Sequence, residues 1–445
     1  MAVRIAMIGT GYVGLVTGAC FAELGHDVTC VDADPGRIAR IQRGEMPFYE
    51  PDLEALVARN VAAGRLRFST DTAASVRGRE AVFIAVGTPS EGDTGRADLR
   101  HVFAAAGEVA AAIDTFTVVV TKSTVPVGTN RRVADRLREV LGDSARFAVA
   151  SNPEFLREGA AIRDFMEPDR VIVGAEDDRA FAVMARVYAP MAASLRLLRT
   201  NIETAEVVKY AANGFLAVKV GFINEIADLC EATGADVRQV AAGLGLDHRI
   251  GAAFLRTGPG WGGSCLPKDT RALAATAEDA GVASRIVSAA IAANSARKAA
   301  MVERIRRAAG GTLAGRRIGV LGVTFKGQTD DMRESPSLDI LPPLVAEGAE
   351  LVAYDPGEPP EAPRLLPGVT LVASAAAAAT DAELLVVLTD WQSFAALDLG
   401  ALARAMRTPH MLDLRNLFDG QDVLAAGFAR YEGLGATPLE AGPAA

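Results

Sequence analysis

The sequence lacks several features that would point to particular classes of protein. It has only four cysteines in 445 residues, Cys20, Cys30, Cys230 and Cys265, and none forms the closely spaced pair that holds a metal. Such scattered cysteines also argue against disulfides. Positive charge is not in excess: the formal net charge is −9, so no general surface for nucleic acid is expected. An anionic ligand would need a locally basic pocket instead.

Long apolar runs are also missing. The longest are of strand length or rich in alanine, well short of the roughly 20 residues that a membrane span needs. Residues 1–8 lead directly into a glycine-rich turn, which leaves no room for the three regions of a signal peptide. We therefore expect a soluble, cytoplasmic protein. Its 50% hydrophobic and 23% charged residues are typical of a globular enzyme, and its length allows two or three domains.

Short runs rich in Val, Ile and Leu alternate with helical stretches in two parts of the chain. The first part has such runs at residues 3–8, 28–32, 82–86, 117–121, 147–151 and 171–173, and the second at 318–323, 351–354, 384–388 and 411–414. Continuous apolar strands between helices indicate a parallel sheet that is covered on both faces. Between the two parts, residues 202–233 have the pattern of one long helix, and more helix follows to about residue 309.

The pattern predicts an α/β protein with two Rossmann-like doubly wound domains, joined by a long central helix and a helical middle domain. We place the first domain at residues 1–200, the helical domain at 201–310 and the second α/β domain at 311–435. Residues 357–367, rich in Pro and Glu, are expected to form a surface loop, and residues 436–445 a flexible tail.

A glycine-rich turn follows the first expected strand. Gly9, Gly11 and Gly14 in the run Gly-Thr-Gly-Tyr-Val-Gly would permit a tight turn and bring backbone close to a pyrophosphate at a helix N-terminus. Asp32 ends the second strand, where a carboxylate can accept hydrogen bonds from ribose hydroxyls and would repel a 2′-phosphate. NAD is therefore favoured over NADP. The alternative is that Asp32 caps a turn and the glycines serve packing.

Cys265 lies in the run Gly-Pro-Gly-Trp-Gly-Gly-Ser-Cys-Leu-Pro-Lys-Asp at residues 258–269. Pro267 suits the first turn of a helix, so Cys265 would precede a helix N-terminus, a position that lowers a thiol pKa. A thiolate there could add to an aldehyde and, after loss of a hydride, become a thioester. Asp269 could orient the cysteine or a hydrolytic water. The alternative is an inert cysteine beside a helix cap, which is the interpretation that suits the other three cysteines.

Lys209 and Asn213 are spaced i, i+4 on the central helix and so share one face. A cation and an amide at one spot could hold a developing oxyanion, although such a pair is often only a solvated face. Small apolar neighbours at residues 210–215 favour the functional interpretation.

Further candidates follow two later strands, at the carboxyl edge where open sheets bind ligands. Glu154 and Glu158 could act as a base and as a ligand-binding acid, or could merely complement a helix dipole. Thr124 could relay a proton through water, or could cap the turn.

Several motifs stand in order along the chain: GTGYVG, STVPVGT, NPEFLREGAAIRDF, KYAANGFLAVKVGFINEIADLCEATG, GGSCLPKD and GVLGVTFKGQTDDMRESPS. Together they resemble the UDP-glucose 6-dehydrogenase family from about residue 3 to 430, within a superfamily that includes GDP-mannose and UDP-N-acetylmannosamine dehydrogenases. The resemblance implies an NAD-dependent, four-electron oxidation of UDP-glucose to UDP-glucuronate through a cysteine thiohemiacetal and thioester. It also implies a homodimer or higher homo-oligomer, with no metal and no nucleic-acid or membrane partner.

The resemblance implies a role for each candidate residue. The catalytic set is Cys265 as nucleophile, Lys209, Asn213 and Asp269 around the reacting carbon, Glu154 in thioester hydrolysis and Thr124 in positioning a water. The NAD-binding set is Gly9, Gly11, Tyr12, Val13, Gly14, Asp32, Thr88, Thr124, Glu158 and Lys268. The substrate-binding set is Glu154, Phe155, Leu156, Lys209, Asn213, Arg249, Phe254, Arg256, Gly262, Lys326, Arg333 and Arg415. By the same resemblance, Arg249 is lent across a dimer interface and residues 311–435 bind the nucleotide diphosphate.

Two competing interpretations fit the sequence less well. A relative that acts on an acetamido sugar tends to carry His just before the cysteine, where this chain has Ser264, and the Ala-Ala-Asn-Gly run after Lys209 resembles the UDP-glucose branch more than the GDP-mannose one. A non-catalytic module that senses NAD or a nucleotide sugar would be expected to lack Cys265, Lys209 or Asp269, and all three are present.

Overall fold

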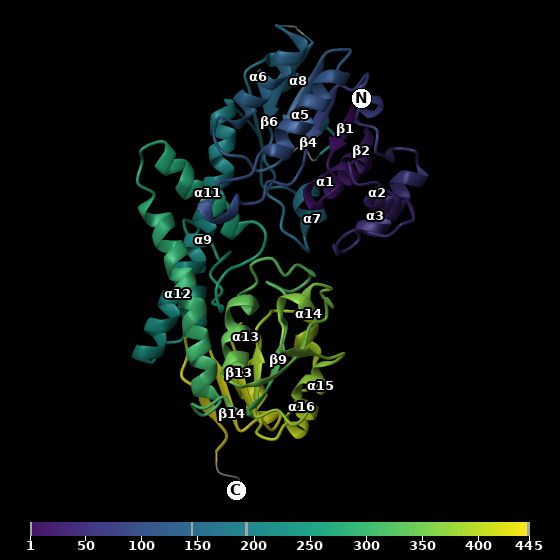
Figure 1. The fold of residues 1–445 in the computed structure, drawn as a ribbon. Coiled ribbons are helices and arrows are strands. Elements are labelled where there is room, and N and C mark those ends of the chain that lie inside the picture. The colour runs from purple at the N-terminus through teal and green to yellow at the C-terminus, as the bar shows by residue number, and fades with distance from the viewer. Residues whose placement is uncertain (1, 144–145, 192–194, 443–445) are drawn as a thin grey trace. The chain divides into compact units, whose positions relative to one another are not determined.

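The computed structural model describes residues 2–143, 146–191 and 195–442. The chain forms two compact units: Met1–Ala212 with Arg271–Ala283, and Asn213–Thr270 with Ser284–Ala445. Two helices, α9 (Ile202–Thr233) and α11 (Leu266–Asp279), run through the boundaries between these segments. Each unit is built around one parallel-dominated sheet (Figure 1).

The first unit has an eight-stranded sheet in the order β3-β2-β1-β4-β5-β6-β7-β8. All neighbours are parallel except β6 and β7, which are antiparallel. The strands are β1 (Arg4–Ile8), β2 (Asp27–Val31), β3 (Leu66–Ser69), β4 (Ala81–Ile84), β5 (Thr117–Thr121), β6 (Phe147–Ser151), β7 (Val171–Ala175) and β8 (Leu197–Thr200). The strand order reverses between β1 and β4, which is where open α/β sheets bind ligands.

Helices cover both faces of this sheet because alternate residues of each strand point to opposite sides. In β1, Ile5 and Met7 join one core cluster while Ala6 and Ile8 join the other. Helices α1 (Tyr12–Glu23), α3 (Leu53–Ala62), α7 (Ala161–Met166) and α8 (Asp178–Tyr188) supply the first cluster; α4 (Thr72–Val76), α5 (Arg100–Ala112) and α6 (Thr129–Leu141) supply the second. Helix α2 (Pro35–Gln42) and the 3₁₀ turn η1 (Gly92–Thr94) complete the described elements of this unit.

The second unit repeats the arrangement with seven strands in the order β11-β10-β9-β12-β13-β14-β15. They are β9 (Arg317–Leu321), β10 (Glu350–Tyr354), β11 (Val369–Leu371), β12 (Leu384–Val387), β13 (His410–Asp413), β14 (Arg430–Gly433) and β15 (Leu439–Glu440), of which only β14 and β15 pair antiparallel. The helices are α10 (Val237–Leu246), α12 (Arg285–Ala308), α13 (Pro336–Ala346), α14 (Ala362–Leu365), α15 (Ala375–Ala379), α16 (Leu399–Ala405) and α17 (Gly420–Ala425), with the 3₁₀ turn η2 (Gln392–Ala396).

The predicted fold class is confirmed, and the central helix has the predicted bounds of 202–233. The strands that the sequence pattern missed, β3, β8, β11, β14 and β15, are edge or short strands that carry polar or exposed residues and so give no continuous apolar run. Two local expectations need correction. The loop expected at residues 357–367 contains α14, and the tail expected from residue 436 contains β15, which hydrogen-bonds to β14. Residues 443–445 of that tail lie outside the described residues.

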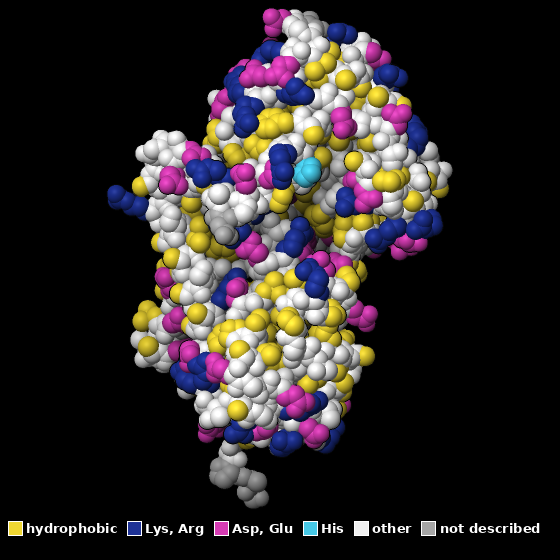
Figure 2. Space-filling model, viewed as in Figure 1, with side chains coloured by type: hydrophobic (Ala, Val, Ile, Leu, Met, Phe, Trp, Pro, Cys, Tyr) yellow, Lys and Arg dark blue, Asp and Glu magenta, His cyan; other side chains and the backbone are white. Residues whose placement is uncertain are grey.

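None of the described helices is long and apolar enough to cross a membrane. On the face drawn in Figure 2, basic and acidic side chains are interspersed on both units, as expected for a chain with modest net charge.

Candidate active site

The first βα turn has the geometry of an anion-binding turn. Gly9 has φ +102°, and a Cβ there would lie 2.6 Å from the carbonyl oxygen of Ala85 after β4; a Cβ on Gly14 would lie 2.0 Å from the Gly9 carbonyl oxygen. A Cβ on Gly11 would meet nothing within 4 Å, and no described side chain caps α1 at this residue. An uncapped helix N-terminus with open space at Gly11 fits a bound pyrophosphate.

Asp32 lies beside this turn at the end of β2. Its Oδ2 accepts hydrogen bonds of 2.8 Å from both the backbone N–H and the hydroxyl of Thr10, and pairs with Arg37 Nη1 at 3.1 Å. Burial alone would raise the pKa of Asp32, but hydrogen bonds from Asp34 and Thr10 and the charge of Arg37 hold it below its usual value. The carboxylate is thus ionised and organises the turn, and its side chain is 11% exposed.

Tyr12 connects the glycine turn to the segment after β6. Its hydroxyl donates to Glu50 Oε2 at 2.6 Å, and the Glu50 carboxylate also accepts the backbone N–H groups of Gly159 and Ala161 at 2.6 and 2.7 Å. Burial, followed by the Glu50 contact, raises the pKa of Tyr12, so the phenol stays protonated. Sequence reasoning missed Glu50, because it follows no strand and belongs to none of the motifs. Val13, on the same first turn of α1, is half-buried against the core.

Thr88 and Thr124, at the ends of β4 and β5, are brought together by the structure. The hydroxyl of Thr88 donates to the carbonyl oxygen of Thr124 at 2.9 Å, and both residues are buried. Ser123 donates to the Val86 carbonyl oxygen at 2.7 Å and so closes the same pair of loops.

Glu154 and Lys209 form a buried ion pair at 3.0 Å, with side chains only 5% and 4% exposed. Glu154 Oε2 also accepts the Leu156 N–H at 2.5 Å. Burial raises the pKa of Glu154, but the charge of Lys209, the Leu156 N–H and the charge of Lys122 together keep it below its usual value. The sequence named Glu154 and Lys209 separately, and the structure brings them together.

The neighbours of this pair are partly apolar. The Phe155 ring lies under Lys209 Nζ at 5.4 Å and under the Arg170 guanidinium at 3.7 Å. Leu156 packs against the core, and Glu158 is buried in the same segment. The structure therefore collects four of the predicted residues, 154–156 and 158, at one end of β6.

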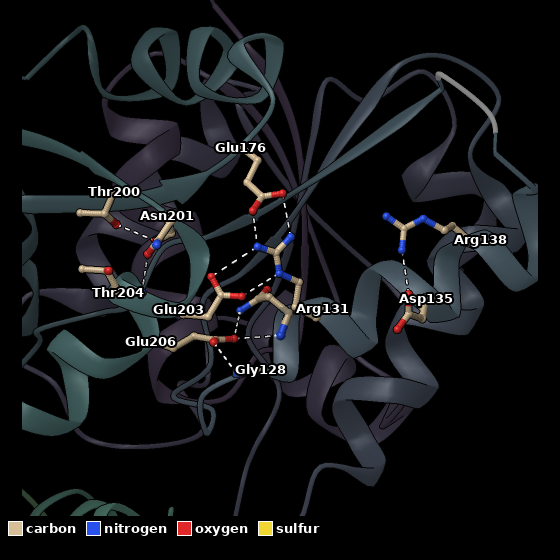
Figure 3. A network of polar contacts seen from close by, with 11 residues as sticks. Gly128, Arg131, Asp135, Arg138, Glu176, Thr200, Asn201, Glu203, Thr204 and Glu206 are labelled. Atoms are coloured by element: carbon tan, nitrogen blue, oxygen red, sulfur yellow. Dashed lines mark hydrogen bonds and ion pairs between the residues drawn. The ribbon is translucent and has the colours of Figure 1, made fainter. Parts of the chain in front are cut away.

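The first turns of α9 anchor the loop that carries Thr124 (Figure 3). The Glu206 carboxylate accepts the Gly128 N–H at 2.7 Å, the Asn130 N–H at 2.8 Å and the Asn130 side-chain amide at 2.7 Å. Arg131 pairs with Glu203 of α9 at 2.7 Å. Burial raises the pKa of Glu206 despite these bonds. Sequence reasoning missed Glu206, and its spacing of i, i−3 from Lys209 was the available signal.

Cys265 stands immediately before α11 in the second unit. Its carbonyl oxygen accepts the Asp269 N–H at 2.8 Å in the first turn of that helix, and its thiol sulfur lies 3.5 Å from the Ser264 hydroxyl. The expected position at a helix N-terminus is therefore present. The residue is partly exposed, whereas Cys20, Cys30 and Cys230 are buried, and burial raises the pKa of Cys30 to about 12.

The glycines before Cys265 let the backbone of this loop pack closely against another segment of the second unit. A Cβ on Gly262 would lie 2.1 Å from the Glu334 carbonyl oxygen, and Gly263, at φ +87°, would place one 2.6 Å from the Phe325 ring. The Gly263 N–H also donates to the Arg333 carbonyl oxygen at 3.0 Å. The close backbone approach expected at these glycines is thus to the segment 325–334, which carries the basic residues assigned to the substrate.

Three polar side chains hold the same loop from the helices of the second unit. Asn224 on α9 accepts the Gly258 N–H at 2.9 Å, and Arg297 on α12 donates to the Gly258 carbonyl oxygen at 3.1 Å. Asn294 on α12 accepts the Trp261 N–H at 2.8 Å, and the Trp261 side chain is buried. Sequence reasoning missed Asn224, Asn294 and Arg297, because isolated polar residues on long helices carry no local signal.

Asn213 and Asp269, predicted from separate motifs, are in direct contact. Asn213 Nδ2 donates to Asp269 Oδ2 at 2.6 Å, and both side chains are buried. The other oxygen of Asp269 binds Lys268 Nζ. The orientation of the Asn213 amide is therefore set by a carboxylate at the start of α11.

In the second unit the basic residues assigned to the substrate follow β9 and β13. Arg415 donates to the carbonyl oxygens of Leu388 at 2.8 Å and Phe325 at 2.9 Å. Lys326 Nζ lies 5.4 Å above the Phe325 ring, and Arg333 pairs with both oxygens of an aspartate two residues earlier. Burial raises the pKa of Asp390, but Arg415, the Gly327 N–H and Arg256 bring it below its usual value.

The remaining predicted substrate residues lie in the segment 249–256. Phe254 has φ +65°, a left-handed conformation that a bulky side chain rarely adopts and that often marks a functional site. Arg256 is exposed. Arg249 is 78% exposed and pairs with Asp247, so the second unit by itself does not bring it to the other predicted residues.

Three family models match the chain in succession. They describe the NAD binding domain (residues 3–192), the central domain (203–296) and the UDP binding domain (319–420) of the UDP-glucose/GDP-mannose dehydrogenase family. A UDP-glucose 6-dehydrogenase of Rhizobium meliloti is 50% identical over 97% of this chain and 99% of that protein. UDP-glucose 6-dehydrogenase TuaD of Bacillus subtilis is 43% identical over 97% and 93%.

Solved structures agree with these similarities. A UDP-glucose dehydrogenase from Pyrobaculum islandicum superposes with a TM-score of 0.90 at 37% identity, covering 98% of both chains. A UDP-D-ManNAc dehydrogenase from Pyrococcus horikoshii superposes with a TM-score of 0.84 at 27% identity, covering 97% of this chain and 99% of that one.

Proposed function

Because the chain belongs to the UDP-glucose/GDP-mannose dehydrogenase family, we propose that it is a UDP-glucose 6-dehydrogenase. It would oxidise the C6 alcohol of UDP-glucose to the carboxylate of UDP-glucuronate in two successive NAD-dependent steps. The observation that carries this proposal is Cys265, the one partly exposed cysteine, at the start of α11 and four residues from the buried Asn213–Asp269 contact. A single nucleophile of this kind suits an alcohol that is taken to an acid without release of the aldehyde.

The residues of the first βα turn fit NAD. The open N-terminus of α1 at Gly11 would take the pyrophosphate, and the ionised Asp32 would accept the ribose hydroxyls. Of the remaining residues assigned to the cofactor, the turn contributes Gly9, Tyr12, Val13 and Gly14, and other segments contribute Thr88, Thr124, Glu158 and Lys268. When bound, NAD supplies the hydride acceptor for both oxidations.

Cys265 would act after the first oxidation. Its thiolate, stabilised by the N-terminus of α11, forms a C–S bond with the aldehyde carbon and leaves a hemiacetal oxyanion on C6. Loss of the C6 hydride turns this adduct into a thioester. Water then attacks the thioester carbon, the C–S bond breaks, and the thiolate of Cys265 is restored as the carboxylate leaves.

Lys209 and Asn213 would stabilise the negative oxygen in these steps. They are spaced one turn apart on α9, and each is fixed by a carboxylate: Lys209 by Glu154 at 3.0 Å and Asn213 by Asp269 at 2.6 Å. Donors that are oriented before the reaction stabilise developing charge without reorganisation. The buried setting strengthens each of these interactions.

Glu154 and Thr124 would serve the hydrolysis. The Glu154 carboxylate remains ionised and can take a proton from water as it attacks the thioester. Thr124 would position that water, and the Thr88 hydroxyl fixes its backbone. Both residues stand at carboxyl ends of neighbouring strands, β6 and β5.

The substrate would be held by the basic loop of the second sheet and by the sugar-facing residues. Lys326 and Arg333 suit the diphosphate, and Arg415 orients their loop through the Phe325 carbonyl. The residues assigned to the rest of the substrate are Glu154, Phe155, Leu156, Phe254, Arg256 and Gly262, with Arg249 acting in a partner subunit.

We infer the same division of labour for the domains: residues 1–200 for NAD, 201–310 for dimerisation and 311–435 for the UDP-sugar, in a cytoplasmic homodimer or higher homo-oligomer. Phe215, Phe222 and Leu229 support the dimer. They recur every seven residues on α9 and are 64%, 49% and 56% exposed, so they form one apolar stripe on the helix surface.

A panel assay tests the proposal directly. Purified protein is incubated with NAD and UDP-glucose, GDP-mannose or UDP-N-acetylmannosamine, and NADH is followed to completion. UDP-glucose should be the preferred substrate and should give two NADH per sugar with no free aldehyde. One NADH per sugar would contradict the thioester route, and preference for another sugar would contradict the substrate assignment.

A further inference from the structure

Lys122 is a buried cation to which the proposed reaction assigns no role. It follows β5 directly and is 4% exposed. Its Nζ lies 3.1 Å from Asn152 Oδ1, and 3.5 Å from both the Pro153 carbonyl oxygen and the Tyr188 hydroxyl. All three partners are neutral, and among the described residues no carboxylate lies within ion-pair distance of this amine.

A buried amine that has no carboxylate as an ion-pair partner is unfavourable when it is charged. The burial of Lys122 therefore needs an explanation. The charged groups that act on Lys122 are Glu154, on the segment after β6, and Lys209, on α9; the third titratable neighbour is the Tyr188 phenol on α8. Burial lowers the pKa of Lys122 to about 7; Glu154 counteracts this shift and Lys209 adds to it. The Glu154 carboxylate is thus paired with Lys209 and also feels the charge of Lys122.

We propose that Lys122 is a positioning residue of the reaction: through its contacts with Asn152 and the Pro153 carbonyl oxygen it fixes the 152–154 segment, and its charge favours the carboxylate form of Glu154. This inference rests on the proposed function, because it assigns Glu154 as the base that takes a proton from water. Lys122 is assigned no contact with the substrate or the cofactor; it acts through Asn152 and Glu154.

The charges that develop during the proposed reaction explain why a second amine near Glu154 is useful. While Lys209 stabilises a negative oxygen on the substrate, it stabilises the Glu154 carboxylate less. The pKa of Glu154 would then rise toward the value that burial favours. The charge of Lys122 opposes that rise. Through Asn152 it also fixes the backbone directly before Glu154, since Asn152 is bound in turn to the Tyr188 hydroxyl at 2.6 Å and the Ile172 carbonyl oxygen at 2.7 Å.

The alternative is that Lys122 only packs the ends of β5 and β6 through Asn152. Tyr188 separates the two roles, because it binds the same Asn152 oxygen and carries no positive charge. Loss of the Tyr188 hydroxyl should therefore reproduce the structural effect of losing Lys122 and leave the electrostatic effect untouched.

The test measures turnover with saturating UDP-glucose and NAD between pH 4 and 9 for the parent, Lys122→Met, Lys122→Gln, Lys122→Arg and Tyr188→Phe. Loss of the charge should move the acid limb of the profile to higher pH by about one unit, because one fewer cation acts on Glu154. At pH 8.5, where the amine of the parent has lost its own proton, Lys122→Met and Lys122→Gln should turn over within about twofold of the parent. Lys122→Arg should keep the parent acid limb.

Tyr188→Phe should lower the thermal midpoint and leave the acid limb in place. The proposal is overturned if the acid limb of Lys122→Met and Lys122→Gln coincides with that of the parent, or if these variants lose activity equally at every pH. Carbon-13 NMR titration of the Glu154 carboxyl, with the resonance assigned by Glu154→Gln, measures the effect of Lys122 on Glu154 without an activity assay. The pKa of Glu154 should rise in Lys122→Met. A parent that makes no NADH from UDP-glucose would overturn the proposed function alone, since the titration would still decide the role of Lys122.

Discussion

The two sheets of this protein begin with the same turn and then diverge. Gly9 after β1 and Gly322 after β9 both have positive φ, and each donates its N–H at 2.7 Å to the carbonyl at the end of the neighbouring strand, Val31 or Tyr354. In both units an aspartate follows that strand and accepts the N–H and hydroxyl of a threonine of the turn: Asp32 from Thr10, and Asp355 from Thr324.

The two units differ in the segment that comes after the turn. In the first unit α1 begins at Tyr12, directly after the glycines, and no described side chain caps it. In the second unit the chain makes a long excursion before α13, whose N-terminus is capped by Ser335. The excursion carries Lys326 and Arg333. One unit thus has an uncapped helix N-terminus after its turn and the other has basic side chains, although the underlying strands and turns are alike.

Neither of these turns supplies the proposed nucleophile. Replacing Cys265 by Ser should therefore abolish turnover without abolishing the binding of NAD and UDP-glucose, and it should give the largest effect of the variants considered. Turnover to the acid should fall by about 10³-fold or more, since a neutral hydroxyl is a far weaker nucleophile than a thiolate and a poorer leaving group. NAD and UDP-glucose should still bind, as measured by calorimetry. Cys230→Ser is the matched control and should keep its turnover while it stays folded. Turnover near the parent rate in Cys265→Ser would make Cys265 structural.

Asp355→Ala should show that the aspartate of the second unit stabilises the fold. Its carboxylate accepts four hydrogen bonds, from the N–H groups of Val323, Thr324 and Gly357 and from the Thr324 hydroxyl, and the residue is buried. Leaving these donors unpaired should lower the free energy of unfolding by about 3 kcal/mol. Denaturant titration measures the loss, with Asp32→Ala as the control. An equal or larger loss in Asp32→Ala would remove the distinction between the two aspartates.

Gly11→Ala should weaken NAD without weakening the fold. The new methyl group meets no protein atom within 4 Å, so the free energy of unfolding should change by less than about 0.5 kcal/mol. The same methyl group occupies the space before α1, and KM for NAD should rise about 10- to 100-fold, by analogy with the close backbone approach that such turns require.

Gly322→Ala is the counterpart in the second sheet. Its Cβ would lie 2.3 Å from Thr389 Cβ, at a positive φ, so this variant should lose stability and keep its KM for NAD in the fraction that folds. A raised KM for NAD in both variants, or in neither, would contradict the division between the two turns.

Asp32→Ala should have the smallest effect, on the choice of cofactor. The parent should prefer NAD over NADP by at least about tenfold, because a 2′-phosphate would meet an ionised carboxylate. The variant should lose most of that preference, since Arg37, which now pairs with Asp32, becomes available to a phosphate. Steady-state kinetics with both cofactors measures the ratio, and an unchanged ratio would show that Asp32 does not meet the ribose.

Much of this organisation could be predicted from the sequence, for identifiable reasons. Buried parallel strands such as β5 are apolar on both faces, and α9 is long enough to show its period, so the pattern predicts their bounds well. The residues that we propose to react could be named from the sequence because they lie in compact motifs, either after strands, on α9 or at the start of α11. Glu50, Glu206, Asn224, Asn294 and Arg297 could not, because each supports a backbone segment distant in sequence and no local pattern marks such a contact.

The burial of three cysteines also determines how the protein should meet oxidants. Cys20, Cys30 and Cys230 lie inside the core, and burial raises the pKa of Cys20 and Cys30, so peroxide would find few thiolates there. Cys265 is partly exposed at a helix N-terminus, where a thiolate is favoured. Oxidative damage would therefore concentrate on the one thiol to which the proposed reaction assigns a role, as a sulfenic acid that reducing thiols can reverse. The protein would lose its activity long before it loses its fold.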